Sequence, residues 1–225
     1  MRVLVIDTAL GLCTAGVFEV EGDAVRVLGL RSEAMIKGHS ERLGGLARDA
    51  AAEAGGFDAI DRIGVTVGPG SFTGLRVGLA FAQGLGAALD RPVVGISTLD
   101  ALAASVDGPD IAALIDARRG QVYARFWRAG LPEGPPEALS LDTAAERVAA
   151  LGSGAVLVGT GAPLMTEAAS AAVAADLPGP SPAAIARLAA ALDPALAPPS
   201  PLYLRAPDAT PPTRLPGQPR ASAPA

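Results

Sequence analysis

The chain has 225 residues, half of them hydrophobic, with 23 acidic and 18 basic side chains and a formal net charge of −5. This length suits one or two domains with a sizeable buried core. The acidic balance argues against a protein that holds nucleic acid by itself, because neutralisation of phosphates dominates such binding. If RNA is involved, we expect a partner to carry it.

Scarce residue types narrow the chemistry further. His39 is the only histidine, Lys37 the only lysine and Cys13 the only cysteine. A Cys/His zinc site or a paired-histidine metal site therefore cannot be built within one chain, and no internal disulfide can form. A Ser-His-Asp triad would have to use His39, for which a polar role at a helix start is the favoured interpretation. We predict no metal site and no catalytic residue.

Targeting signals are not evident in the sequence. The N-terminus MRVLVID reaches an acid too early for a signal peptide, and no apolar run approaches the roughly 20 residues that span a bilayer. We therefore expect a cytoplasmic protein with no membrane partner.

The first half of the chain alternates between strand and helix patterns. Strands with short turns are predicted at 2–7, 14–20 and 24–31, which indicates an antiparallel meander. A helix over 40–54 follows, with Ser40 as its N-cap and Gly55 and Gly56 at its end. The next elements are a strand, a helix, a strand and a short helix capped by Ser97 or Thr98, at 62–67, 73–89, 92–97 and 99–105. This order predicts a mixed sheet with helices on its faces.

The second half begins a shorter version of the same plan. Strands at 111–116 and 121–128 precede a helix at 142–151, a strand with a glycine turn at 155–161, and two alanine-rich helices up to Leu192. We therefore expect an α/β protein with two related mixed-sheet lobes, the second abbreviated. The predicted division is 1–107 for the first lobe, 108–205 for the second, and 206–225 for a proline-rich tail that is disordered or draped on the surface.

A glycine-rich turn, GPGSFTGLRVG at 68–78, is the most informative stretch. Helix N-termini bind phosphate, and Gly70 and Ser71 with Asp7 and Thr8 at the end of the first strand could form a weak ATP or ADP site. The P-loop pattern fails, however, because Leu75 and Arg76 follow Gly74 where a Lys-Ser/Thr pair is required. A turn-capping role for Asp7 and Thr8 is equally natural.

The helix that follows this turn is apolar almost all round. Between 75 and 89 only Arg76 and Gln83 are polar, and small residues recur every fourth position. Such a stripe lets another backbone come close, either within the chain or in a partner. The favoured interpretation is a surface between subunits, shared with the preceding helix and its Gly44-Gly45 pair. The predicted contact residues are Leu43, Leu46, Ala50, Gly74, Leu75, Gly78, Leu79, Ala82 and Gly86.

Six motifs in this order resemble the TsaB (YeaZ) family and extend to Arg205. They are VIDTA, GPGSFTGLRVGLAFAQGLG, GISTLDALA, IDARRGQVY, VGTG and PLYLR. The resemblance implies an actin- and hexokinase-like (ribonuclease H-like) fold. It also implies a subunit of the machinery that forms threonylcarbamoyladenosine beside the anticodon of tRNAs that decode ANN codons. In that machinery TsaD is the catalyst, TsaE is an ATPase, and TsaB pairs with TsaD through its first two helices.

The same resemblance implies a non-catalytic subunit that meets TsaE through the heterodimer and tRNA only indirectly. TsaD-type catalysts carry two metal-binding histidines four residues apart, whereas Leu43 stands four residues after His39. The absence of this pair also counts against a metallopeptidase. Two alternatives stay open: an ATP-dependent phosphotransferase or ATPase that uses Asp7 and Thr8, and a homodimer formed by the same helices when no partner is present.

Overall fold

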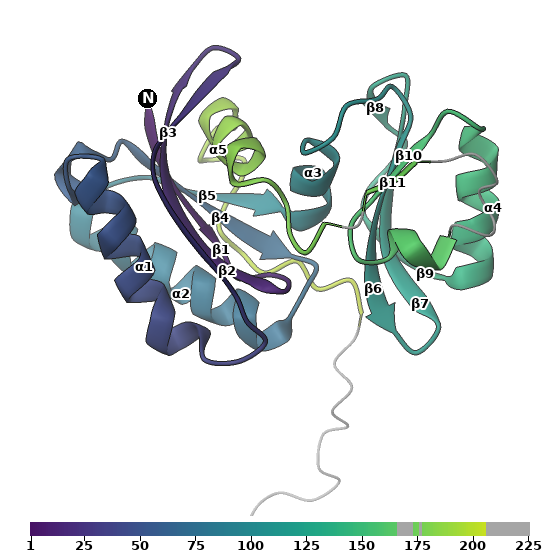
Figure 1. The fold of residues 1–225 in the computed structure, drawn as a ribbon, viewed down its shortest axis with the longest axis horizontal. Helices are drawn as coiled ribbons and strands as arrows, with labels where there is room; N and C mark the ends of the chain where they lie inside the picture. The colour runs from purple at the N-terminus through teal and green to yellow at the C-terminus, as the bar shows by residue number, and fades with distance from the viewer. Residues whose placement is uncertain (166–172, 176, 206–225) are drawn as a thin grey trace, which may run out of the picture.

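Two mixed β-sheets form the body of the protein (Figure 1). The structure is a computed structural model and describes residues 1–165, 173–175 and 177–205. In the first sheet, β2 and β3 follow β1 as an antiparallel meander, and β4 and β5 run parallel to β1. The meander and the mixed sheet are therefore confirmed. In spatial order the strands are β3 (Ala24–Ala34), β2 (Leu12–Glu21), β1 (Arg2–Asp7), β4 (Arg62–Gly68) and β5 (Val93–Ser97).

Helices cover both faces of this sheet. In Figure 1, α1 (His39–Glu53) and α2 (Phe72–Leu89) lie on one face, and α5 (Pro182–Ala191) lies on the other. A single 3₁₀ turn, η1 (Phe57–Ala59), leads from α1 towards β4.

The two helices on this face begin in different ways. Ser71 caps α2 by accepting a 3.2 Å hydrogen bond from the amide of Gly74. The expected cap at Ser40 is wrong. Gly38 precedes α1 in the left-handed conformation with φ of 87°, and no described side chain caps this helix. A glycine adopts this conformation without steric cost, so the chain turns into the helix two residues earlier.

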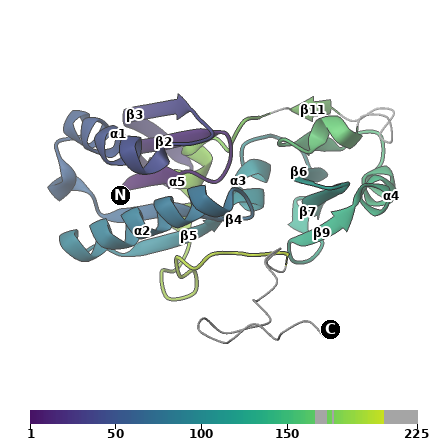
Figure 2. The ribbon, with the colours of Figure 1, turned by 90° about the horizontal axis from the view of Figure 1, so that it is seen from below.

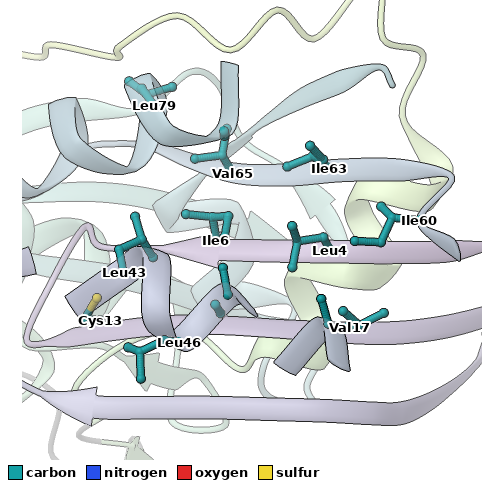
Figure 3. Packing of buried hydrophobic residues seen from close by; sticks show 14 of the residues in the cluster. Leu4, Ile6, Cys13, Val17, Leu43, Leu46, Ile60, Ile63, Val65 and Leu79 are labelled. Atoms are coloured by element: carbon teal, nitrogen blue, oxygen red, sulfur yellow. The ribbon is translucent and has the colours of Figure 1, made fainter. Parts of the chain in front are cut away.

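The core of the first lobe lies between the sheet and the α1–α2 pair (Figure 3). Leu4 and Ile6 of β1 point towards these helices and meet Leu43 of α1 and Leu79 of α2, all of them buried. Their neighbours on β1 point to the opposite face, towards α5, because side chains alternate along a strand. Both faces of β1 are therefore covered by apolar helices.

The second sheet repeats the plan of the first. Strand β9 pairs with β7 and β7 with β6 in antiparallel fashion, while β10 and β11 continue from β6 in parallel. The predicted duplication is confirmed, and the last two strands are only three residues long. The bounds are β6 (Ile111–Arg118), β7 (Gln121–Arg128), β8 (Leu131–Pro132), β9 (Glu137–Ser140), β10 (Val156–Val158) and β11 (Val173–Ala175).

Three short helices complete the second lobe and its junction with the first. Helix α4 (Leu141–Leu151) and the 3₁₀ helix η2 (Ala162–Met165) cover one face of the second sheet. Helix α3 (Thr98–Ala103) lies between the lobes and packs against β6 (Figure 1). Ser97 caps α3 by accepting a hydrogen bond from the amide of Asp100, which settles the choice between Ser97 and Thr98.

The end of the described chain returns to the first lobe. Helix α5 packs on the first sheet, and Arg62 Nη1 at the start of β4 donates 2.8 Å hydrogen bonds to the carbonyls of Ala189 and Leu192 at the end of that helix. Residues 108–205 therefore do not form a lobe by themselves, which corrects the expected division. The reason is that the face of the first sheet opposite α1 and α2 is apolar, and α5 buries it from water.

Two further expectations concern the C-terminal half. The first of the two alanine-rich helices falls largely on residues 166–172 and 176, outside the described residues, and Val173–Ala175 form a strand instead. The second alanine-rich helix is α5, as expected. The tail at 206–225 also lies outside the described residues.

Residues 197–205 form an extended segment, here called the strap, that runs from the first lobe to the second (Figure 2). Along β5 and β4, the amide of Gly95 donates to the carbonyl of Ala197, and the amide of Leu202 donates to that of Val67. At the second lobe, Arg205 Nη2 donates to Gln121 Oε1 at 2.6 Å. The strap thus links the two lobes.

Candidate functional site: a groove between two helices

A groove of about 540 Å³ lies between α1 and α2 on the outer side of the first lobe. Its walls are mainly apolar, and at its middle Gly44 of α1 leaves room for the ring of Phe81 on α2. No described segment of this chain covers the exposed residues Gly44 and Ala80. The lining residues are Ser40, Leu43, Gly44, Phe72, Thr73, Arg76, Val77, Ala80 and Phe81.

The opposite side of α2 carries the glycine stripe and faces the chain's own first sheet. A methyl group added at Gly74 would overlap the carbonyl oxygen of Thr8, and one added at Gly78 would overlap the Thr8 hydroxyl. At the far end of the helix, Gly86 makes the same kind of close approach to the side chain of Val93. The small residues of the stripe therefore allow β1 and β5 of this chain to pack closely against α2, and they leave no room there for another subunit.

The nine residues predicted to contact a partner are consequently in the wrong place for direct contact. Leu43, Leu75 and Leu79 are at most 4% exposed, and the other six are likewise buried. Periodic apolar and small residues mark the face of a helix that packs best, and here that face is occupied by the sheet. These nine residues pack α1 and α2 onto the rest of the lobe. The outer surface of the two helices is formed by other residues, among them Gly44, Phe72 and Ala80.

Most of the residues that line the groove were missed at the sequence level. Their signal was present in the all-round apolar character of α2, because a helix that buries one face needs apolar residues on only that face. Phe72 is 53% exposed, and Ala80 and Gly84 are exposed on the same helix. The Gly44-Gly45 pair was expected to help α1 admit a partner, and an added methyl group at either glycine would meet no close contact within the described chain.

By length and composition α2 also meets the criteria for a membrane span, with 18 residues and a mean hydropathy of 1.2. Its contacts with β1 and β4 show that one side serves as a core helix of the first lobe.

Asp7 lies at the end of β1 and is fully enclosed. Its Oδ1 accepts a 2.7 Å hydrogen bond from the hydroxyl of Thr66 and a 3.0 Å bond from the amide of Ala9. Burial raises the pKa of Asp7 above its ordinary value of 3.8, although these two hydrogen bonds and the nearby His39 act in the opposite direction. Asp7 thus stabilises the turn that follows β1. The sequence allowed either this turn-capping role or a contact with phosphate.

Thr8, Gly70 and Ser71 are the other residues of the expected nucleotide site. The Thr8 hydroxyl donates a 2.7 Å hydrogen bond to the carbonyl of Gly74, and the amide of Ser71 donates a 2.7 Å bond to the carbonyl of Ala9. Gly70 passes so close to Ala9 that a side chain there would overlap its carbonyl. The turn therefore fastens α2 to the end of β1, and Thr8 is only 1% exposed.

His39 begins α1, as expected for a residue at a helix entry, but it is buried with 5% exposure. Its Nε2 has no hydrogen-bond partner among the described residues. Leu43, one turn later, is part of the apolar core. Within residues 1–165, 173–175 and 177–205, no three His, Cys, Asp or Glu side chains are grouped so that they could hold a metal ion.

Comparison with known sequences finds similarity to tRNA-modification proteins. Residues 26–130, which include α1 and α2, match the family model described as TsaD, tRNA N6-adenosine threonylcarbamoyltransferase. An uncharacterised protein of Mycobacterium tuberculosis is 39% identical over 93% of this chain and 94% of its own length. An uncharacterised Mycobacterium leprae protein is 41% identical over 57% of this chain, which spans 36% of that protein. TsaB of Escherichia coli is 33% identical over 55% of this chain and 53% of its own.

Solved structures match most of the chain. YeaZ from Pseudomonas aeruginosa superposes with a TM-score of 0.72 and 27% identity, covering 90% of this chain and 99% of that one. The ROK hexokinase of Thermus thermophilus has a TM-score of 0.52 at 18% identity, over 84% of this chain and 98% of its own, and shows the fold alone. The duplicated, mixed-sheet architecture is thus the actin- and hexokinase-like fold.

Proposed function

Because this chain belongs to the TsaB (YeaZ) family, we propose that it is the non-catalytic subunit that pairs with a TsaD-type threonylcarbamoyltransferase during formation of threonylcarbamoyladenosine in tRNA. The site of pairing is the outer face of α1 and α2. As for the family, the modified base is the one beside the anticodon of tRNAs that decode ANN codons.

The groove between α1 and α2 is the observation that carries this proposal. It leaves Gly44, Phe72 and Ala80 exposed beside the partly buried Val77 and Phe81, and contiguous exposed apolar surface marks interaction sites. The match of residues 26–130 to the TsaD family model includes these two helices. A chain and a partner with the same pair of helices can meet about a near-twofold axis, as two copies of one chain do in a homodimer.

Two features support a non-catalytic role. TsaD-type catalysts carry two histidines four residues apart, whereas this chain has Leu43, a core residue, four residues after His39. The His39 side chain is buried, and its Nε2 has no hydrogen-bond partner among the described residues. Asp7 and Thr8, the residues that an ATPase or phosphotransferase would use, are buried in hydrogen bonds within the fold. The ATPase, phosphotransferase and metallopeptidase alternatives therefore gain no support from these positions.

The expected roles of TsaE and tRNA follow from the pairing of this chain with a TsaD-type protein. TsaE would act on the heterodimer, and tRNA would be held by the partners, because this chain carries a net charge of −5. We expect the complex to work in the cytoplasm. Without its partner, the chain would cover the same groove by forming a homodimer, which the partner should dissolve when mixed with it.

Reconstitution of the modification from purified components tests the proposal. TsaD, TsaE, the enzyme that supplies the threonylcarbamoyl-adenylate, and tRNA would be combined with and without this chain. We expect modified nucleoside, measured by mass spectrometry, to form only when the chain is present. Equal yields in both reactions would remove the proposed function.

A further inference from the structure

We propose that Arg76 binds a carboxylate of the partner protein at one end of the groove, and that Phe72 and Tyr203 hold its guanidinium ready for that contact. The inference rests on the proposed function, because it names a chemical feature of the partner that enters the groove.

The guanidinium of Arg76 is held between two aromatic residues. Its central carbon lies 3.8 Å from the centroid of the Phe72 ring, and its Nε donates a 3.3 Å hydrogen bond to the hydroxyl of Tyr203. The Phe72 and Tyr203 rings are themselves in contact, with centroids 5.7 Å apart. Arg76 and Phe72 belong to α2, whereas Tyr203 comes from the strap. These contacts fix the plane of the guanidinium, and its two terminal nitrogens make no hydrogen bond to a described residue.

The charge of Arg76 is not neutralised within the described chain. It is the one charged residue that lines the groove, and no described carboxylate lies within ion-pair distance of it. By contrast, Arg42 and Arg48 on α1 are paired with Glu33 and Asp49. A planar guanidinium with free terminal nitrogens matches a carboxylate in two parallel hydrogen bonds. A fixed cation beside an apolar groove therefore selects an apolar partner segment that carries an aspartate or glutamate.

The surroundings favour a protein over a nucleic acid. Beyond Arg76 the groove is lined mainly by apolar residues, among them Leu43, Val77 and Phe81, which offer nothing to a phosphate backbone. The other polar side chains that line it are the hydroxyls of Ser40 and Thr73, which add no positive charge. A second copy of this chain is also a poor match, because the described residues that line its groove include no carboxylate and would bring a second Arg76. Like charges at an interface weaken it, so Arg76 favours the heterodimer over the homodimer.

Tyr203 is a positioning residue in this arrangement. Its hydroxyl accepts the hydrogen bond from Arg76 Nε, so both terminal nitrogens of the guanidinium are left for the partner. Tyr203→Phe keeps the ring beside Phe72 and removes only the hydrogen bond.

Affinity for the purified TsaD-type protein of the same organism, measured by calorimetry at low and high salt, tests this inference. We expect Arg76→Gln to weaken binding about tenfold or more and to reduce its salt dependence, because a charge-assisted hydrogen-bond pair is lost. The affinity of Arg76→Lys should lie between those of the wild type and Arg76→Gln, since lysine retains the charge without the planar pair of donors. Tyr203→Phe should weaken binding by about two- to threefold. Arg26→Gln, a change at an exposed arginine on β3, is the matched control and should leave binding unchanged.

Homodimerisation of the chain without its partner gives the second readout. Arg76→Gln should leave the homodimer as stable as before or strengthen it, which loss of folding could not do. Thermal melting checks that each variant is folded. If Arg76→Gln does not fold, the comparison of Tyr203→Phe with the wild type tests the inference instead.

The outcomes separate the two proposals. Failure of the wild-type chain to bind the TsaD-type protein would overturn the proposed function, and this inference with it. Binding by the wild type with the same affinity and salt dependence for Arg76→Gln would overturn this inference only. Loss of tRNA binding by Arg76→Gln, with partner affinity unchanged, would assign Arg76 to a nucleic acid and also overturn it.

Discussion

The hydroxyl of Thr8 donates a 2.7 Å hydrogen bond to the carbonyl of Gly74, so the end of β1 and the first turn of α2 are fastened together. This contact requires the backbone of α2 to lie against β1, which only residues without bulk allow. It places the glycine stripe inside the lobe and leaves the other side of α2 for the groove.

Two glycines of α2 should respond in opposite ways to the same change. Gly78→Ala would place a methyl group against the Thr8 hydroxyl, and we expect it to lower the free energy of unfolding by about 1–3 kcal/mol. Gly84→Ala faces open space and should raise it by about 0.5–1 kcal/mol, because alanine favours the helix. Urea denaturation measures both. If the two variants changed stability equally, the assignment of the stripe to the core would be wrong.

Partner binding should depend on the exposed residues of the groove. Ala80→Glu places a carboxylate beside Val77 and Phe81 and one helical turn after Arg76. We expect it to weaken binding of the TsaD-type protein about tenfold or more, since it adds a charge to an apolar surface and competes with the partner for the Arg76 guanidinium. Ala149→Glu, on the exposed side of α4, is the control and should bind normally. Size-exclusion chromatography of each mixture gives a first result, and calorimetry gives the affinity. Normal binding by a folded Ala80→Glu chain would place the interface elsewhere.

Asp7 should make stability depend on pH. Because burial raises its pKa in the folded state, the folded chain holds this proton more tightly than the unfolded chain does. The contribution of Asp7 to stability is therefore greatest below its ordinary pKa of 3.8 and is lost as pH rises through the raised value. Every tenfold difference in proton affinity between the folded and unfolded chains corresponds to about 1.4 kcal/mol of stability.

Asp7→Asn removes this titration and keeps an oxygen that can accept from Thr66 and Ala9. We expect the variant to gain stability relative to the wild type as pH increases from 4 towards neutrality, and the difference then to level off. Denaturation curves at a series of pH values measure it. Parallel stability profiles for the two proteins would contradict a raised pKa.

Cys13 should be inert in the folded chain. It is fully buried, and burial together with the charges of Glu33 and Asp7 raises the pKa of its thiol to about 11. We expect no reaction with a thiol reagent at pH 8 under native conditions and one equivalent per chain in denaturant. Rapid reaction of the native protein would show that the lobe opens readily at β2.

The sequence predicted the fold well because each half carries strong local patterns. The strands at 2–7 and 121–128 have the predicted bounds, since each is a run of strand-forming residues ended by a turn. Strands β8, β9 and β11 were missed, because segments of two to four residues carry too little periodicity to be recognised. The return of α5 to the first sheet was missed because local patterns do not reveal which sheet a helix will cover.

The sequence singled out the two helices that line the groove but not most of the residues on their outer faces. The recurrence of small residues in α2 correctly indicated a close approach by another backbone. Which backbone makes this approach depends on tertiary structure, and Thr8 of the same chain takes the place assigned to a partner. Arg76 and Tyr203 lie 127 positions apart, so no local pattern could have joined them.

The position of α5 also determines when the first lobe can be completed during synthesis. Val3, Val5, Phe18 and Ile96 form an apolar surface whose cover includes Ile185 of α5. A ribosome has therefore translated most of the chain before the N-terminal sheet can bury its second face. Until then this sheet presents apolar side chains to solvent, and a chain that ended before Pro182 would leave them exposed permanently. Early termination late in the reading frame should consequently yield an insoluble product, even though every strand of the N-terminal sheet has been made.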